Sequence, residues 1–397
     1  MSRVIHQSPY MLCTDRGEAH ARKVVVDFLA TLFGPGWSNM LAGGYNMNNI
    51  PDTNAKIPAA RPEWIRKMEP FAKPDLRRAI IQLINTVIPY LALMTLMAGT
   101  VLWRWPVWAT LLLALPAGAF LVRIFIFFHD CCHGSYLSSQ KAMHIVGAVL
   151  GFLVFTPFGQ WRHSHGIHHS TAGNLDRRGI GDVWTMTVDE YRVSSPLRRL
   201  EYRMFRHPLV LFGLGPLFLF VVVQRIPVRG TSPMQKRSVL LTDLSLLIVV
   251  ALASATIGIK AYLLIQLPVM FIAGMCGIWL FYVQHQFDPT YWARSDDWES
   301  MDAAMQGSSF YKLPAVLQWF SGNIGLHHIH HLKPRIPNYN LQACLEAVKE
   351  LRLPDPLTIR KSFTSISLNL WDETLKRLLS FRQVAQALTG KKRYGAT

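Results

Sequence analysis

The sequence has few charged residues, and acidic ones are particularly scarce. Charged residues make up 16% of its 397 residues, while 50% are hydrophobic and the mean hydropathy is +0.19. Ordinary soluble proteins contain about 25% charged residues, so this balance excludes a disordered chain, a collagen or a nucleic-acid-binding tail and indicates a membrane protein. The chain has 41 Lys and Arg but 24 Asp and Glu, a net charge of +17. Such an excess is typical of loops held at the cytoplasmic face, in contact with anionic lipid or an acidic partner.

Cysteine and recognisable targeting segments are also scarce. The five cysteines are an odd number, Cys131 and Cys132 are adjacent, and no CxxC pair occurs. A disulfide framework is therefore not expected, which favours a reducing, cytosol-facing compartment. The opening residues MSRVIHQSPY contain no apolar run of the kind that a signal peptide has, so we expect insertion through internal segments. Since no transit segment is apparent either, a bacterial inner membrane is favoured over an organelle.

The chain does contain long apolar runs, and these occur in two pairs. Each is about the length that a spanning helix requires. They cover residues 79–102 and 107–128, and residues 239–259 and 261–283. Two shorter runs, 145–158 and 209–224, suit re-entrant or interfacial segments. The joints within the pairs carry Arg104 and Lys260, whereas most other Lys and Arg fall on the opposite side, as the positive-inside rule requires.

The sequence therefore predicts an all-α integral membrane protein with a cytosolic helical cap. We expect four transmembrane helices in two hairpins, with both ends cytosolic; six spans is the alternative. The expected divisions are an N-terminal cytosolic or interfacial segment 1–75, a main domain 76–350 and a basic C-terminal tail 351–397. Further helices are expected at 24–33, 341–351 and 372–388. Arg123 interrupts the second apolar run and is expected to extend to the cytosolic end without a catalytic role.

The 15 histidines are distributed very unevenly. Most gather in three motifs and at the end of the last apolar run, all on the same predicted membrane face. These are HDCCH (129–133), HGIHH (165–169), HHIHH (327–331) and the single His285. On a helix, residues four apart lie about 40° apart, and the three histidines of HxxHH fall within about 100°. Each motif can thus offer two or three imidazoles to one point, which predicts metal binding.

The donor set narrows the choice of metal without settling it. HExxH is absent, so a zincin site is not indicated, and the Glu-x-x-His pairs of soluble di-iron carboxylate proteins are absent too. Eight or nine histidines are too many for one ion and suit two. Histidine-rich coordination without thiolates is compatible with iron, copper, zinc or nickel.

These motifs, in this order, resemble those of the membrane fatty acid desaturases. Residues 159–179 (GQWRHSHGIHHSTAGNLDRRG) and 327–341 (HHIHHLKPRIPNYNL, with an HH…P.YN pattern) are similar to the second- and third-motif regions of the acyl-lipid Δ12, or ω-6, branch. Residues 129–139 (HDCCHGSYLSS) are similar to its first motif, usually HDCGH or HECGH, with Cys132 at the Gly position, which is not a ligand. The resemblance covers roughly residues 75–350.

The resemblance implies a non-haem di-iron centre that uses O2 and two electrons to introduce a cis double bond into a fatty acyl chain of a membrane lipid. A separate electron donor, either ferredoxin or a b-type cytochrome, is implied because the HPGG motif of a fused cytochrome is absent. The ligands carried over by position are His129, His133, His165, His168, His169, His327, His330 and His331. His285 matches an additional ligand that related desaturases place at the end of the last span.

Polar neighbours should orient these rings by accepting their second N–H. The candidates are Asp130, Asn174, Asp176, Asp182, Asp288 and Asn323. His163 and His328 lie outside the arcs of their motifs and are expected to point elsewhere.

Two other functions remain open at this point. The same centre could hydroxylate or ketolate an alkane, a sterol or a carotenoid. A membrane metal transporter or receptor is the other alternative, and it predicts ligands deep within the spans rather than at their ends.

Overall fold

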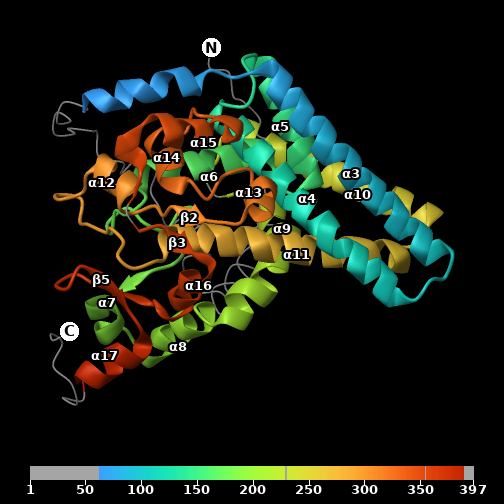
Figure 1. Cartoon of the computed structure of the whole chain (residues 1–397). Helices are drawn as coiled ribbons and strands as arrows, with labels where there is room; N and C mark the ends of the chain where they lie inside the picture. The colour runs from blue at the N-terminus through green and yellow to red at the C-terminus, as the bar shows by residue number, and fades with distance from the viewer. Residues whose placement is uncertain (1–61, 229, 354, 389–397) are drawn as a thin grey trace, which may run out of the picture.

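The computed structural model of the chain describes residues 62–228, 230–353 and 355–388. Within them, a bundle of long helices extends from one side of a cap made of short helices and strands (Figure 1). The helix predicted at 24–33 lies outside the described residues.

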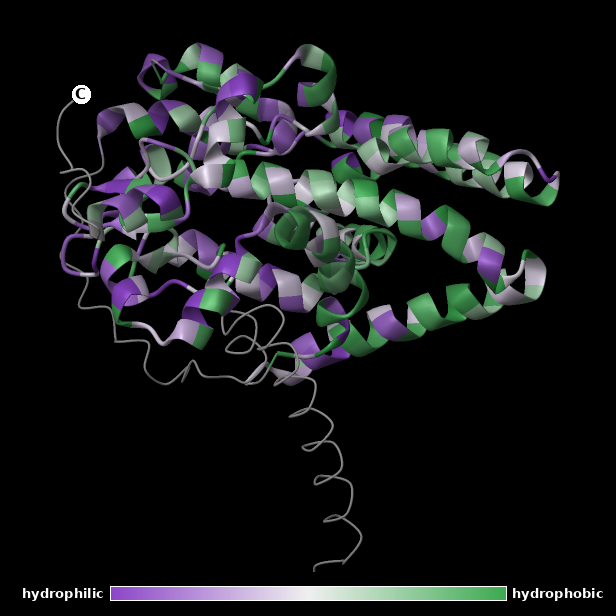
Figure 2. Ribbon diagram, turned by 90° about the horizontal axis from the view of Figure 1, so that it is seen from below, coloured by the Kyte–Doolittle hydropathy of each residue, from purple (hydrophilic) through white to green (hydrophobic). Residues whose placement is uncertain are grey.

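Among the described residues, four helices are long and apolar enough to cross a membrane, as predicted, and the number rises to six if each of two bent helix pairs is one span. The four helices are α3 (Leu76–Leu102), α4 (Val107–His133), α10 (Pro233–Thr256) and α11 (Ile259–His285). They form two hairpins whose tips point away from the cap (Figure 1). Hydrophobic residues predominate along these helices, and hydrophilic residues gather at the cap end (Figure 2). The fold is thus that of an integral membrane protein. The four long apolar runs that the sequence predicts in two pairs are confirmed as helices.

Local sequence signals fix where the spans begin and how they pack. The side chain of Asp75 accepts a hydrogen bond from the backbone N–H of Arg78 and caps α3, while Ser232 and Gln235 form a capping box at the start of α10. Helix α4 is the most enclosed span and packs on both α3 and α11. At Gly118 a Cβ atom would lie 2.6 Å from Ile272 Cγ2, so only glycine lets α11 approach this closely.

Two bent helix pairs lie where the short apolar runs were predicted. Helices α5 (Gln140–Leu153) and α6 (Phe158–Thr171) meet at 98°. The predicted run 145–158 extends across this bend, where Phe155 adopts a φ of 56° and Pro157 precedes α6. The second pair meets at 56°. It comprises α8 (Pro196–Phe205), then η4 (Leu209–Leu214), α9 (Gly215–Val221) and η5 (Val223–Arg225).

The cap consists of short elements from several parts of the chain. Its helices are η3 (Glu63–Ala72), α7 (Val188–Val193), α12 (Ser300–Met305), α13 (Ala315–Phe320), α14 (His327–Leu332), α15 (Asn338–Ala347), η6 (Lys349–Leu351), α16 (Ile359–Ser362), η7 (Phe363–Ser367) and α17 (Phe381–Leu388). Two small sheets join them. One has the order β1 (Met186–Thr187), β4 (Leu370–Asp372), β5 (Arg377–Leu379), and the other pairs β2 (Tyr311–Lys312) with β3 (Leu357–Thr358).

The predicted helix 372–388 is wrong in its first half. Strands β4 and β5 form an antiparallel hairpin there, and only α17 is helical. The side chain of Asp372 accepts hydrogen bonds from the backbone N–H groups of Thr374 and Leu375, and Lys376 has a φ of 52°. This turn, together with the parallel pairing of β4 to β1, outweighs the helical propensity of the segment.

Arg123 extends toward the cap end of the bundle, where it is buried against the cap helix α13 instead of reaching water. Its side chain is 3% exposed and lies between α3, α4 and α13. Its Nε donates to Thr86 Oγ1 at 3.1 Å, and its Nη1 donates to the Trp319 carbonyl oxygen. The guanidinium lies 3.9 Å from the centre of the Trp319 ring. Thr86 and Trp319 thus supply the hydrogen bonds and the aromatic contact that the buried guanidinium needs. These contacts hold α13 against the spans.

Candidate metal centre

Four elements bring the histidine motifs together at the cap end of the bundle. The last two turns of α4 carry His129 and His133, and α11 ends at His285. Helix α6 carries the second motif and the short helix α14 carries the third. Helix α4 ends at His133, the last residue of its motif, because Gly134 adopts a left-handed φ of 70°.

All nine predicted ligands fall into two compact groups. Within each group, one possible ligand atom per residue lies within 4.8 Å of all the others. The first group, here called the five-histidine group, contains His129, His133, His165, His169 and His330. The second, the four-histidine group, contains His168, His285, His327 and His331. Each motif contributes to at least one group, and the second and third motifs contribute to both.

The distances between the ring nitrogens match those of ligands that share an ion. Two nitrogens that bind one ion at about 2.1 Å are about 3.0–3.4 Å apart. Four pairs of Nε2 atoms lie at 3.0–3.2 Å. These pairs are His168 with His285, His285 with His327, His165 with His169, and His169 with His330. The residues present therefore fit a histidine-bound metal in each group.

The two groups are adjacent and belong to one centre. The rings of His169 and His331, one from each group, stack with centroids 4.1 Å apart. Those of His168 and His169 lie 5.6 Å apart.

Burial keeps the third-motif imidazoles neutral. Burial, followed by the neighbouring imidazoles, holds the pKa of His327, His330 and His331 well below the ordinary value of 6.5. The Nε2 atom of His331 is a buried nitrogen without a hydrogen-bond partner. A neutral imidazole with an available lone pair is the form that binds a transition metal.

Three ligand rings contact groups that orient them. The His168 Nδ1–H donates to Asp182 Oδ1 at 2.7 Å, and the His285 Nδ1–H donates to the Gly307 carbonyl oxygen at 3.2 Å. Asp130 Oδ1 lies 3.4 Å from His129 Nδ1. A bond to one ring nitrogen fixes which nitrogen keeps the lone pair for a metal.

The other predicted orienting residues lie elsewhere and contact no histidine of the groups. Asn174 accepts from the backbone of its own turn, and Asp176 binds Arg294. Asp288 binds Arg377, and Asn323 donates to the Asn338 carbonyl oxygen. His328 Nε2 donates to the Leu351 carbonyl oxygen, so its ring points away from the centre, as expected.

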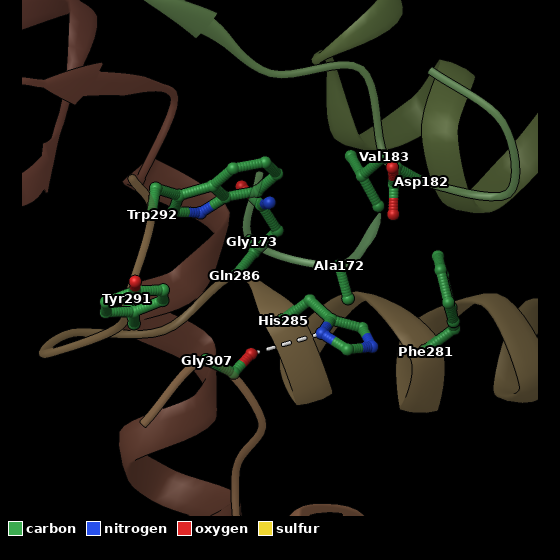
Figure 3. Close-up of a pocket in the computed structure, with 10 residues that line it drawn as sticks. All are labelled: Ala172, Gly173, Asp182, Val183, Phe281, His285, Gln286, Tyr291, Trp292 and Gly307. Carbon is green, nitrogen blue, oxygen red and sulfur yellow. Dashed lines mark hydrogen bonds between the residues drawn. The ribbon is translucent and has the colours of Figure 1, made fainter. Parts of the chain in front are cut away.

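A small cavity adjoins the four-histidine group. His285 and Asp182 face it from opposite walls, and the loop carrying Tyr291 and Trp292 closes another side (Figure 3). The Gly307 carbonyl oxygen bonds His285 at its edge (Figure 3). One member of the four-histidine group, His285, thus lines a small cavity in the cap.

Sequence reasoning missed two contributors to the site. The backbone oxygen of Gly307 cannot be identified from residue types. Asn338 belongs to the P.YN pattern, which is part of the family resemblance but does not indicate what this residue does. Its backbone N–H and Nδ2 both donate to Asp130 Oδ2, at 2.7 and 2.8 Å.

Comparisons with known proteins agree with this arrangement. The family model described as "Fatty acid desaturase" matches residues 103–363. A protein of Bacillus subtilis named "Fatty acid desaturase" is 40% identical over 84% of this chain and 94% of its own length. Two Synechocystis proteins match 59% of this chain and 66% of their own lengths: an "sn-1 acyl-lipid omega-3 desaturase (ferredoxin)" at 26% identity and an "sn-1 oleoyl-lipid 12-desaturase" at 24%. The histidine centre at the end of an apolar helix bundle, together with these matches, shows that the chain is an enzyme of the fatty acid desaturase family.

Proposed function

We propose that the protein is an O2-dependent di-iron desaturase that introduces a cis double bond into a fatty acyl chain of a membrane lipid, at the Δ12 or ω-6 position. The observation that carries the proposal is the convergence of nine histidines into two adjacent groups in a chain of this family. The apolar helices next to the groups would keep the acyl chain in a water-poor environment.

The proposed ligands are the five- and four-histidine groups defined above, each holding one iron ion. A bound iron pair would supply the O2 activation that breaks unactivated C–H bonds, which acid–base groups alone cannot do. The protein's contribution is to orient the imidazoles, through Asp182, Asp130 and Gly307.

The overall reaction determines which substrates and electrons must reach the metal centre. A –CH2–CH2– unit, O2, two electrons and two protons yield –CH=CH– and two water molecules. The electrons must come from a separate donor, which we propose to be ferredoxin or a b-type cytochrome. One relative carries ferredoxin in its name, and the net charge of +17 suits an acidic donor.

The Δ12 position and the lipid substrate rest on the second- and third-motif regions and on a relative named for oleoyl-lipid. The side of the membrane rests on charge. Since the hairpin tips carry Arg104 and Lys260 and most other Lys and Arg of the described residues lie outside the four spans, we place the centre on the cytosolic face, in a bacterial inner membrane.

Hydroxylation or ketolation at the same centre is the alternative that the experiment must separate. The transporter hypothesis loses its basis because the chain belongs to an enzyme family and the histidines lie at helix ends and in the cap.

The test is expression in a host that lacks polyunsaturated lipids, followed by lipid mass spectrometry that locates double bonds. The proposal expects a lipid product that has lost two hydrogens, with the new bond at Δ12. A product that has gained oxygen would favour the alternative, and a new bond at another position would correct the regiochemistry. Purified protein should contain about two irons per chain.

A further inference from the structure

The Asn338 side chain is fully buried between α15, α4 and α3, at the junction of the third motif with the first. It is 0% exposed and occupies the first position of α15, seven residues after the third motif ends. Its backbone N–H and Nδ2 donate to Asp130 Oδ2 at 2.7 and 2.8 Å. One residue therefore makes two hydrogen bonds to a single carboxylate oxygen from which it is separated by 208 positions.

Asp130 is itself 2% exposed, so its charge is removed from water. A buried carboxylate is expensive unless hydrogen bonds compensate it, and Asn338 supplies two. An ionised carboxylate only accepts hydrogen bonds. With Oδ2 held by Asn338, Oδ1 remains for the Nδ1–H of His129, which lies 3.4 Å away.

Neighbouring residues on a helix point about 100° apart, so Asp130 does not face its neighbour His129 by helix geometry alone. The two bonds from Asn338 pull the carboxylate toward α15, where it can still reach the edge of the His129 ring. A hydrogen bond from the His129 Nδ1–H to Asp130 Oδ1 would leave the lone pair on Nε2. His129 belongs to the five-histidine group.

We propose that Asn338 is a positioning residue of the five-histidine group, acting through Asp130 on the tautomer and ring orientation of His129. The proposal rests on the proposed function in that the group must bind a metal. It extends that function by assigning the Asn of the P.YN pattern a role in metal affinity.

The same stretch offers a matched control. Asn340 Nδ2 donates to the Phe71 carbonyl oxygen at 2.9 Å, and its Oδ1 accepts from Arg78 at 2.7 Å. It ties α15 to the N-terminal part of the fold without touching Asp130. Gln82 does not serve as a control, because its Nε2 donates to Asn338 Oδ1 at 2.9 Å and its Oε1 accepts from Asn338 Nδ2 at 3.3 Å, so a substitution there would disturb Asn338 itself.

The experiment compares Asn338→Ala with Asn340→Ala in the full chain in detergent. Iron affinity is measured by titration, and the ⁵⁷Fe Mössbauer spectrum reports each iron separately. We expect Asn338→Ala to weaken the binding of one of the two irons by about tenfold and to change the spectrum of that iron, as loss of an orienting neighbour does. The Asn340→Ala control should keep two irons with wild-type spectra. Equal iron affinity in Asn338→Ala and Asn340→Ala would overturn the proposal.

A double mutant separates positioning from general support. If Asn338 acts through Asp130, then Asp130→Ala/Asn338→Ala binds iron as Asp130→Ala does. Additive losses would show that Asn338 acts by another route and would refute the proposal. Should Asn338→Ala not fold, the comparison of Asn338→Ser with Asn340→Ser decides in the same way. Failure of the wild-type chain to bind iron would instead refute the proposed function.

Discussion

His168 and Asp182 are joined by a 2.7 Å hydrogen bond from the ring Nδ1–H to the carboxylate, while His168 Nε2 faces His285 Nε2 at 3.2 Å. One nitrogen of the ring thus bonds the carboxylate, and the other faces a histidine of the four-histidine group. The backbone makes this contact possible, because a Cβ atom at residue 181 would lie 2.9 Å from His168 Cβ and Gly181 has none. The φ of +75° at Gly181 is also one that glycine adopts without strain.

Asp182→Ala should weaken metal binding by the four-histidine group by about 10–100-fold, because His168 loses the acceptor that fixes its orientation. Iron titration of the purified protein measures this. The control is Asp176→Ala, which removes a carboxylate bound to Arg294 from the same loop and should leave iron binding unchanged. Equal effects of the two substitutions would contradict the assignment of Asp182.

His285→Ala and His328→Ala should have opposite profiles, although both remove a buried imidazole. His285 lies in the four-histidine group, so its loss should reduce the iron content by about one ion per chain. His328 bonds the Leu351 carbonyl oxygen instead, so its loss should cost about 1–3 kcal/mol of stability and leave both irons bound. Metal analysis and thermal unfolding distinguish them. Loss of iron from His328→Ala would show that the groups are assigned wrongly.

Arg123→Ala should destabilise the protein by about 1–3 kcal/mol, because the Trp319 carbonyl oxygen and the Trp319 ring lose their partner. Arg123→Lys should recover only part of this, since an ammonium lacks the planar group that lies over the ring. Thermal unfolding in detergent measures both variants. Wild-type stability in Arg123→Ala would contradict the fastening role, and loss of iron at wild-type stability would give Arg123 a role at the centre.

The link between the loop after α11 and the C-terminal hairpin should weaken in acid. Arg294 donates to both carboxylate oxygens of Glu373 at 2.8 Å, and these bonds lower the pKa of Glu373 below its ordinary value of 4.5. A carboxyl group whose pKa is lower in the folded than in the unfolded protein stabilises the fold at pH values above its unfolded pKa. This contribution is lost as the pH falls through the folded pKa.

Glu373→Gln should therefore lose less thermal stability than the wild type between pH 6 and pH 3.5. Since the carboxylate is partly exposed, the difference should also shrink in high salt. Identical losses in the two proteins would show that this ion pair does not contribute.

The spans and the eight histidines of the three motifs could be predicted because short-range patterns encode them. Apolar length predicts a span, and spacings such as those of His327, His330 and His331 place imidazoles on one face of a helix. His285 has no motif around it, and only its place at a span end and the family resemblance identified it.

The residues that orient the rings could not be sorted from sequence. Asp182 and Asp176 are both acidic and six positions apart in one loop, yet only the path of the backbone turns Asp182 toward His168. Asn338 reaches Asp130 over 208 positions, a contact that no local pattern records. The β4–β5 hairpin was mistaken for a helix because its pairing with β1 is equally non-local.

An anomalous difference map at the iron edge, from crystals of the purified protein, tests the central claim most directly. The account predicts two peaks, one enclosed by the five-histidine group and one by the four-histidine group. One peak alone, or peaks outside these nine imidazoles, would contradict it.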